Sequence, residues 1–165
     1  MGSDKPRRGR KPLVYEGEEL RCTWRFEEEA RAEGRRAVAG MDEVGRGALC
    51  GPVVACVVIL GDGFDTEGID DSKRLTALQR EALSARIRAK ARAFSVGVAD
   101  PKEIDRLNIL RATYVAMERA IAGLAVPPDL ILVDALEVPG VAVKQKPIIK
   151  SSPMTLSRNS AFRSR

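Results

Sequence analysis

The stretch AGMDEVGRGALCGPVVACVVIL, residues 39–60, places two apolar segments on either side of a glycine-rich turn. Val53 to Leu60 is almost entirely apolar and rich in β-branched side chains, which is typical of a strand covered on both faces. Val38 to Met41 reads as an extended strand that enters Asp42. The turn from Gly45 to Gly51 separates the two strands, so we expect them to pair as a central hairpin.

The chain after the hairpin alternates helical and extended patterns. Thr76 and Gln79 have the spacing of a capping box, which predicts a helix from Ala77 to about Ala91 with Leu83 and Ile87 on its buried face. A strand with alternating apolar residues follows, at Phe94, Val96 and Val98.

A second helical region is predicted to begin at Asp100, with Glu103 as its capping partner. Its apolar residues keep the helical period over Ile104 to Leu124, and Leu130 to Val133 then reads as a short buried strand. With the helix from Ala77 to about Ala91 set aside as an excursion between strands, the order is strand, strand, strand, helix, strand. We therefore predict a mixed α/β fold rather than a helical bundle.

The composition limits the chemistry. The chain has 165 residues, of which 44% are hydrophobic, enough for one globular domain with a core. There is no histidine, so carboxylates must carry any acid–base or metal chemistry. The 28 Lys and Arg residues against 23 Asp and Glu residues favour an anionic partner such as nucleic acid. Cys22, Cys50 and Cys56 lack metal-site spacing and are expected to be reduced and buried.

The N-terminal residues differ in composition from the rest of the chain. We expect residues 1–22 to form a disordered basic arm, because Met1 to Pro12 is rich in Lys, Arg, Gly and Pro and has no apolar period.

No apolar run approaches the roughly 18 residues of a membrane span, and charges stand where a signal peptide has its apolar region. The expected protein is a cytoplasmic monomer with no membrane partner.

Acidic residues end two of the predicted strands. Asp42 and Glu43 stand where the first strand meets the glycine turn, and Asp134 ends another strand far along the chain. Carboxylates that end neighbouring strands can converge on a hard divalent ion, because Mg2+ takes oxygen ligands. Glu43 points to the other face of the strand unless the turn re-aims it. An acid after a strand also serves as an ordinary turn or cap residue, so both interpretations stay open.

Two polar loops are candidates for contacts with a sugar-phosphate backbone. In Gly45-Arg46-Gly47 the glycines allow close approach of the main chain and the arginine supplies charge. Ser72 and Lys73 stand just before a predicted helix N-terminus, a place that suits a phosphate. By themselves, these segments also fit an ordinary tight turn and an exposed polar loop.

Taken together, the motifs resemble those of the ribonuclease HII family. The matching segments are Ala39 to Gly47, Gly51 to Ala55, Asp71 to Thr76, Glu103 to Asp105, Asn108 to Leu110, Ala116-Met117 and Val133-Asp134. They occur in the family's order and spacing over roughly Trp24 to Lys150. The resemblance implies an RNase H-like domain over residues 23–150, with a mixed β-sheet flanked by helices and incomplete at the C-terminus.

The resemblance also implies a function. It predicts an endonuclease that hydrolyses the RNA strand of RNA–DNA hybrids and incises duplex DNA at embedded ribonucleotides, with Mg2+ or Mn2+ and two-metal-ion catalysis. The residues that match the family's catalytic metal ligands are Asp42, Glu43 and Asp134. By similarity, the Gly45-Arg46-Gly47 backbone reads the ribose 2′-hydroxyl, and Ser72 with Lys73 holds a backbone phosphate.

The last residues depart from the family pattern. After Lys150 the family continues into an Ala- and Ser-rich helix, a fourth catalytic Asp and a substrate-stacking Tyr, whereas Ser151 to Arg165 has no acid and no Tyr. Met154-Thr155 is encoded ATG-ACN, which contains the Asp codon GAC in another frame. We hypothesise that residues 151–165 are a disordered, out-of-frame tail and that catalysis is impaired.

Two other functions remain open at this point. The chain is alternatively a catalytically inactive module that binds hybrids through its basic residues. A different RNase H-like nuclease, such as a resolvase, would cut substrates without any 2′-hydroxyl, and the glycine-turn motif argues against it.

Fusing an in-frame family C-terminal segment after Lys150 is expected to raise both the melting temperature and Mn2+-dependent incision at a single ribonucleotide. The segment restores a carboxylate that two-metal hydrolysis needs and covers apolar surface. Thermal unfolding and incision by the two forms, measured together, test this, and equal incision would contradict it.

Overall fold

A mixed five-stranded sheet forms the centre of the computed structural model, which describes residues 24–148 except 49, 70–71, 73 and 135–136. The strands are β1 (Val38–Val44), β2 (Val53–Leu60), β3 (Ala91–Ala99), β4 (Leu130–Asp134) and β5 (Gln145–Ile148). They lie in the order β3-β2-β1-β4-β5, with β3, β2 and β1 antiparallel and with β1, β4 and β5 parallel. The predicted mixed α/β class and the central hairpin are both confirmed.

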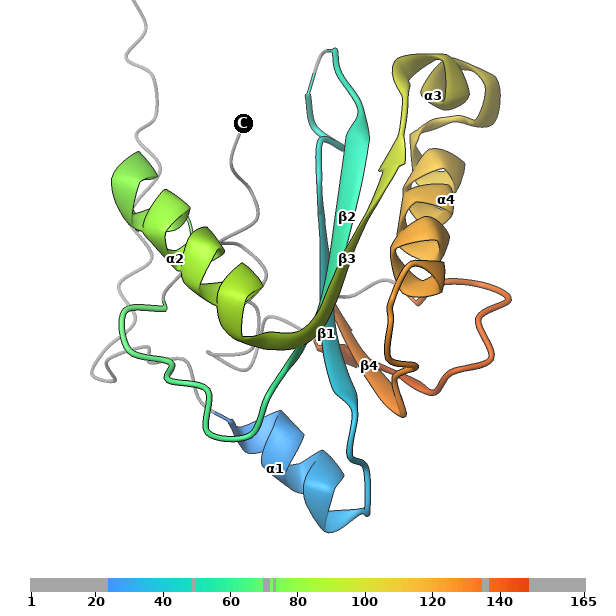
Figure 1. Cartoon of the computed structure of the whole chain (residues 1–165). Helices are drawn as coiled ribbons and strands as arrows, with labels where there is room; N and C mark the ends of the chain where they lie inside the picture. The colour runs from blue at the N-terminus through green and yellow to red at the C-terminus, as the bar shows by residue number, and fades with distance from the viewer. Residues whose placement is uncertain (1–23, 49, 70–71, 73, 135–136, 149–165) are drawn as a thin grey trace, which may run out of the picture.

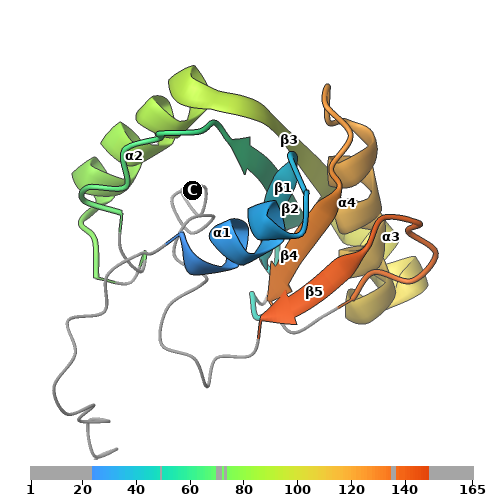
Figure 2. The same ribbon diagram turned by 90° about the horizontal axis from the view of Figure 1, so that it is seen from below.

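Helices cover both faces of the sheet. They are α1 (Arg25–Ala32), α2 (Ala77–Lys90), α3 (Pro101–Leu107) and α4 (Ile109–Ala122). Figure 1 shows α2 and α4 on opposite sides of the sheet, and Figure 2 shows α1 beside the strands on the side of α2. In the described part of the chain, no helix has the length and apolar character needed to cross a membrane.

The largest part of the core lies between α4 and the sheet. The face of α4 that packs there is made of small residues, because Ala112, Ala116 and Ala120 are fully buried. The helix comes so close to β3 that a Cβ atom on Gly97 would collide with the carbonyl oxygen of Ala116. A glycine in the middle of this strand is therefore required by close packing.

The apolar alternation of β3 has an unexpected orientation. Phe94, Val96 and Val98 are 39%, 44% and 42% exposed, whereas Ala93 and Ala99 face the core. The period of two was predicted correctly. The larger side chains point away from α4 because that helix leaves room only for small residues beneath it.

Several local predictions are confirmed and others need correction. Both capping boxes are present, Thr76 with Gln79 and Asp100 with Glu103. The helical region expected from Asp100 onward is interrupted at Asn108, which has φ 69° and whose side chain caps α4. Strand β5 was not predicted from the sequence. The expected N-terminal arm and the C-terminal tail lie outside the described residues.

The cysteines behave differently from one another. Cys56 is buried as expected, Cys50 is exposed contrary to expectation, and Cys22 lies outside the described residues. Burial raises the pKa of the Cys56 thiol to about 12, with a smaller opposing effect from Arg88 and a further rise from Asp42. Cys56 is thus a neutral core residue at physiological pH.

An arginine clamp joins α3, α4 and the outer edge of the sheet. The Arg119 guanidinium donates to both carboxylate oxygens of Glu103, at 2.8 and 2.7 Å, and to the carbonyl oxygen of Val98 at 2.6 Å. The hydrogen bonds from Arg119 lower the pKa of Glu103 from 4.5 to about 2, with help from the backbone N–H of Asp100.

The clamp predicts a pH-dependent stability. Because the folded pKa of Glu103 is depressed, its contribution is complete above about pH 4.5 and is lost as the pH falls toward 2. Glu103→Gln should lower the melting temperature at neutral pH, and the gap from the native chain should close between pH 4.5 and 2. Thermal unfolding at low salt across this range measures the gap, and a gap that does not change with pH would contradict the assignment.

Candidate active site

The register between β1 and β4 brings two acidic positions together. The parallel pairs run from Val38 with Leu130 to Met41 with Val133. The next positions along the two strands are Asp42 and Asp134, although they are far apart in the sequence. The backbone of Asp134 also pairs with Ile148 of β5. The side chain of Asp134 lies outside what the structure describes.

Asp129 fixes this register at the start of both strands. Its carboxylate accepts hydrogen bonds from the backbone N–H groups of Arg36 and Ala37, at 2.8 and 2.9 Å. Its own N–H donates to the carbonyl oxygen of Ala37 at 2.8 Å. The two accepted bonds lower the pKa of Asp129 because they stabilise the ionised carboxylate. The contact between β1 and β4 is therefore held by a charged side chain as well as by the strand ladder.

Asp42 is a buried carboxylate inside β1. The residue is only 6% exposed, and its Oδ1 accepts a hydrogen bond from the backbone N–H of Glu43 at 2.9 Å. Contrary to the sequence interpretation, Asp42 and Glu43 precede the end of the strand, because β1 continues to Val44. Burying a carboxylate is costly unless hydrogen bonds, a cation or a metal ion compensate for the lost water.

Glu43 has two oxygens in different environments. Oε1 accepts a hydrogen bond from the Arg46 guanidinium at 3.2 Å. Oε2 is buried and has no hydrogen-bond partner among the described residues. A buried carboxylate oxygen without a donor is well suited to receive a cation. The pair with Arg46 was not predicted, although the spacing of three residues between opposite charges is visible in the sequence.

The carboxylates of Asp42 and Glu43 have the ligand chemistry of a hard divalent ion, but both residues lie within β1, where neighbouring side chains alternate between faces. They offer only oxygen atoms, the ligand type that Mg2+ and Mn2+ prefer, and one of those oxygens lacks a partner among the described atoms. The described side chains, which do not include that of Asp134, contain no group of three potential metal ligands. A third ligand from position 134 is consistent with the backbone register.

The glycine turn is shaped by contact with β2. Gly45 has φ 104°, and a Cβ atom there would collide with the carbonyl oxygen of Pro52. The N–H of Ala48 donates to the carbonyl oxygen of Gly45 at 3.2 Å and closes the turn. Gly47 has open space where its Cβ would lie. One glycine is thus required by packing, and the other leaves the main chain accessible.

The second predicted phosphate contact is only partly visible. Ser72 is 6% exposed, and its carbonyl oxygen accepts a hydrogen bond from Arg80 at 3.2 Å. It is therefore buried rather than part of an exposed polar loop. Lys73 lies outside the described residues.

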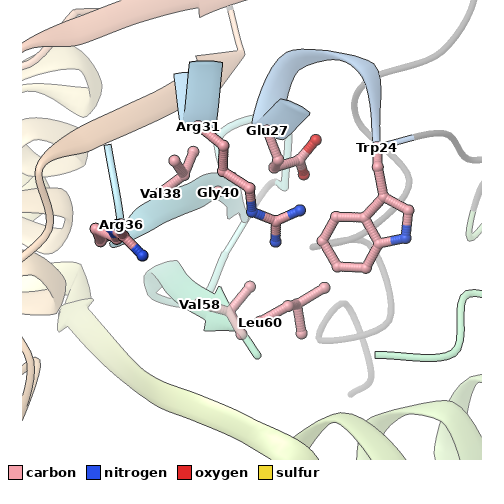
Figure 3. Close-up of a pocket in the computed structure, with 8 residues that line it drawn as sticks. All are labelled: Trp24, Glu27, Arg31, Arg36, Val38, Gly40, Val58 and Leu60. Carbon is pink, nitrogen blue, oxygen red and sulfur yellow. The ribbon is translucent and has the colours of Figure 1, made fainter. Parts of the chain in front are cut away.

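A small cavity of about 30 Å3 lies on the same face of β1 as Asp42 (Figure 3). Arg31 enters it, with its guanidinium 5.3 Å from the centre of the Trp24 ring and 2.8 Å from an oxygen of Asp62. The residues that line it are Trp24, Glu27, Arg31, Arg36, Val38, Gly40, Val58 and Leu60. It has room for roughly one or two water molecules and is too small for a nucleotide. Sequence reasoning missed it because it arises from how α1 packs on the sheet.

Comparison with known proteins gives a consistent result. The sequence matches the family model described as Ribonuclease HII over residues 39–161. It is 46% identical over 144 residues to the ribonuclease HII of Geobacter sulfurreducens, covering 87% of this chain and 66% of that protein. It is 48% identical to the ribonuclease HII of Myxococcus xanthus, covering 86% of this chain and 49% of that protein. The chain thus spans about half to two thirds of the length of the curated relatives that it matches.

Solved structures share the architecture. The ribonuclease H2 of Pyrococcus horikoshii OT3 superposes with a TM-score of 0.57 at 28% identity, covering 76% of this chain and 68% of that chain. Bst-RNase HIII, solved in complex with Mn2+, superposes with a TM-score of 0.56 at 18% identity, covering 76% and 49%. The mixed sheet with its flanking helices is the RNase H-like fold predicted from the sequence.

Replacing Gly45 by alanine should lower the free energy of unfolding by about 1–3 kcal/mol, because the new methyl group combines a strained backbone with a collision against Pro52. Gly47→Ala is the matched control in the same turn. Its methyl group meets nothing within 4 Å, so its effect should stay within about 0.5 kcal/mol. Chemical denaturation of both variants measures the difference, and equal effects would contradict the packing argument.

Proposed function

Because the chain belongs to the ribonuclease HII family, we propose that it acts as a divalent-metal-dependent endonuclease on RNA–DNA hybrids and on duplex DNA with embedded ribonucleotides. The observation that supports this most directly is the β1–β4 register, which pairs Met41 with Val133 and so makes Asp42 and Asp134 the next positions on the two strands. Asp134 ends β4 and Asp42 lies near the end of β1, and residues at such neighbouring positions can act on one ligand.

Asp42, Glu43 and Asp134 are the proposed metal ligands. Residues at matching positions of neighbouring strands face the same side, so the register supports a shared role for Asp42 and Asp134. Glu43 contributes Oε2, its oxygen without a partner among the described residues. Mg2+ or Mn2+ held there would activate a water and stabilise the charge on the leaving 3′ oxygen, which would give 5′-phosphate ends. The Mn2+ complex of Bst-RNase HIII, a protein of the same fold, agrees with this choice of ion.

The glycine turn is the proposed reader of the ribose. A 2′-hydroxyl distinguishes RNA from DNA, and backbone groups can reach it only where no side chain intervenes. The open space at Gly47 and the packed position of Gly45 support this role for Gly45-Arg46-Gly47.

Ser72 and Lys73 are proposed to support a backbone phosphate. The net charge of +5 favours a polyanionic substrate, and we propose a monomer that works in the cytoplasm.

The function is tested with a DNA duplex that carries one ribonucleotide, incubated with the protein and Mn2+. Incision at the ribonucleotide that leaves 5′-phosphate ends is expected. Asp42→Asn should lower it by more than roughly 100-fold, since even groups that only hydrogen-bond to a metal ligand contribute about 10–100-fold. An all-DNA duplex should remain intact. Mn2+ should also raise the melting temperature of the native chain and not that of Asp42→Asn.

The alternative functions give different results in the same experiment. Tighter binding to the ribonucleotide duplex than to all-DNA, without incision, would identify a binding module. Incision of the all-DNA duplex would identify a nuclease of another class. Equal binding to both duplexes at matched salt would leave only nonspecific attraction between charges.

A further inference from the structure

Arg46 contacts a proposed metal ligand rather than pointing only toward solvent. Its Nη1 lies 3.2 Å from Oε1 of Glu43, and the two side chains are 38% and 14% exposed. The other oxygen of the same carboxylate, Oε2, is buried and has no hydrogen-bond partner among the described residues. One oxygen of Glu43 is thus held by the arginine, and the other remains available to a ligand.

We propose that Arg46 is a positioning residue for the metal site: its guanidinium holds Oε1 of Glu43 and so keeps Oε2 oriented to bind the divalent ion. This inference rests on the proposed function, since it takes Glu43 as a metal ligand. It adds that the side chain of Arg46 serves the metal site, while the backbone of the same turn serves the substrate.

The shape of the turn explains how Arg46 reaches Glu43. Gly45 adopts φ 104°, and the hydrogen bond from Ala48 to Gly45 reverses the chain immediately after β1. The close contact of Gly45 with Pro52 leaves no room for a side chain at this position. The reversal places Arg46 beside the strand that carries Glu43, so the position of the arginine depends on the glycine.

Two opposite effects of Arg46 on metal affinity have to be compared. A cation beside the site repels a divalent ion, but water and salt screen this repulsion because the arginine is 38% exposed. A hydrogen bond that orients a ligating carboxylate contributes about 10–100-fold to metal affinity. Orientation should therefore outweigh repulsion, and loss of Arg46 should weaken metal binding.

The type of side chain also matters. A guanidinium has a planar, rigid set of donors, whereas a lysine ammonium is a compact charge on a flexible stem. Lysine at this position should keep the attraction to Glu43 but orient the carboxylate less well. Arg46→Lys should thus recover part of the affinity that Arg46→Gln loses.

The experiment is calorimetric titration of Mn2+ into the full chain without nucleic acid, for the native protein, Arg46→Gln, Arg46→Lys and Glu43→Gln. Arg46→Gln should weaken Mn2+ binding by about 10-fold, with Arg46→Lys between it and the native protein. The melting temperature without metal should change little, because water screens a pair whose arginine is 38% exposed. Arg25→Gln is the control for the loss of one positive charge, since Arg25 forms a more exposed pair with Glu29 at 3.1 Å, with side chains 71% and 42% exposed, and should not affect Mn2+ affinity.

The outcomes separate this inference from the proposed function. Unchanged or tighter Mn2+ binding by Arg46→Gln, with weakened binding by Glu43→Gln, would overturn the positioning role and leave the metal site in place. Native affinity in Glu43→Gln would overturn both, because Glu43 would then not be a ligand. Equal losses in Arg46→Gln and Arg25→Gln would also overturn the positioning role, since they would reflect only the loss of a positive charge.

Discussion

The hydrogen bonds of Asp129 to Arg36 and Ala37 hold the start of β4 against the start of β1, and the candidate site depends on that alignment. Each strand runs from this point toward an acidic residue. Because the side-chain period of a strand is two, a slip of one residue would turn Asp42 and Asp134 to opposite faces of the sheet. The connection between the two strands is long and includes β2, β3 and α4. The entropic cost of bringing chain ends together grows only slowly with the length between them, so this length costs little.

The glycine turn adds a second constraint at the other end of β1. Gly45 fits against Pro52 because it has no side chain, and its positive φ directs Arg46 back toward Glu43. The turn therefore does more than connect two strands. It brings Arg46 to one oxygen of Glu43 and leaves the other without a partner among the described residues. It also leaves the main chain at Gly47 accessible to solvent.

Local signals in the sequence predicted local structure well. The capping boxes at Thr76 and Asp100 formed as expected, because they involve residues only three positions apart. Features that depend on distant contacts were missed. Strand β5 contains two polar residues and a proline, and its strand character comes from pairing with β4. Asn108 interrupts a helical period that continues on both sides of it, because its φ of 69° ends one helix while its side chain begins the next. In the candidate site, the motif predicted Asp42 and Glu43 as ligands, whereas the pairing of Glu43 with Arg46 required the geometry of the turn.

The distribution of charge suggests an order of events under the proposed function. The net charge of +5 attracts a polyanion to the protein as a whole, but the carboxylates of Asp42 and Glu43 repel a phosphate that approaches them closely. A bound divalent ion reverses the local charge, because it is the largest charge in such a site. Arg46 offsets part of the negative charge of Glu43 but leaves its Oε2 without a partner among the described residues. The site therefore retains its affinity for a cation. Under the proposed function, long-range attraction would therefore bring nucleic acid to the surface, and close approach of the scissile phosphate would require a filled metal site.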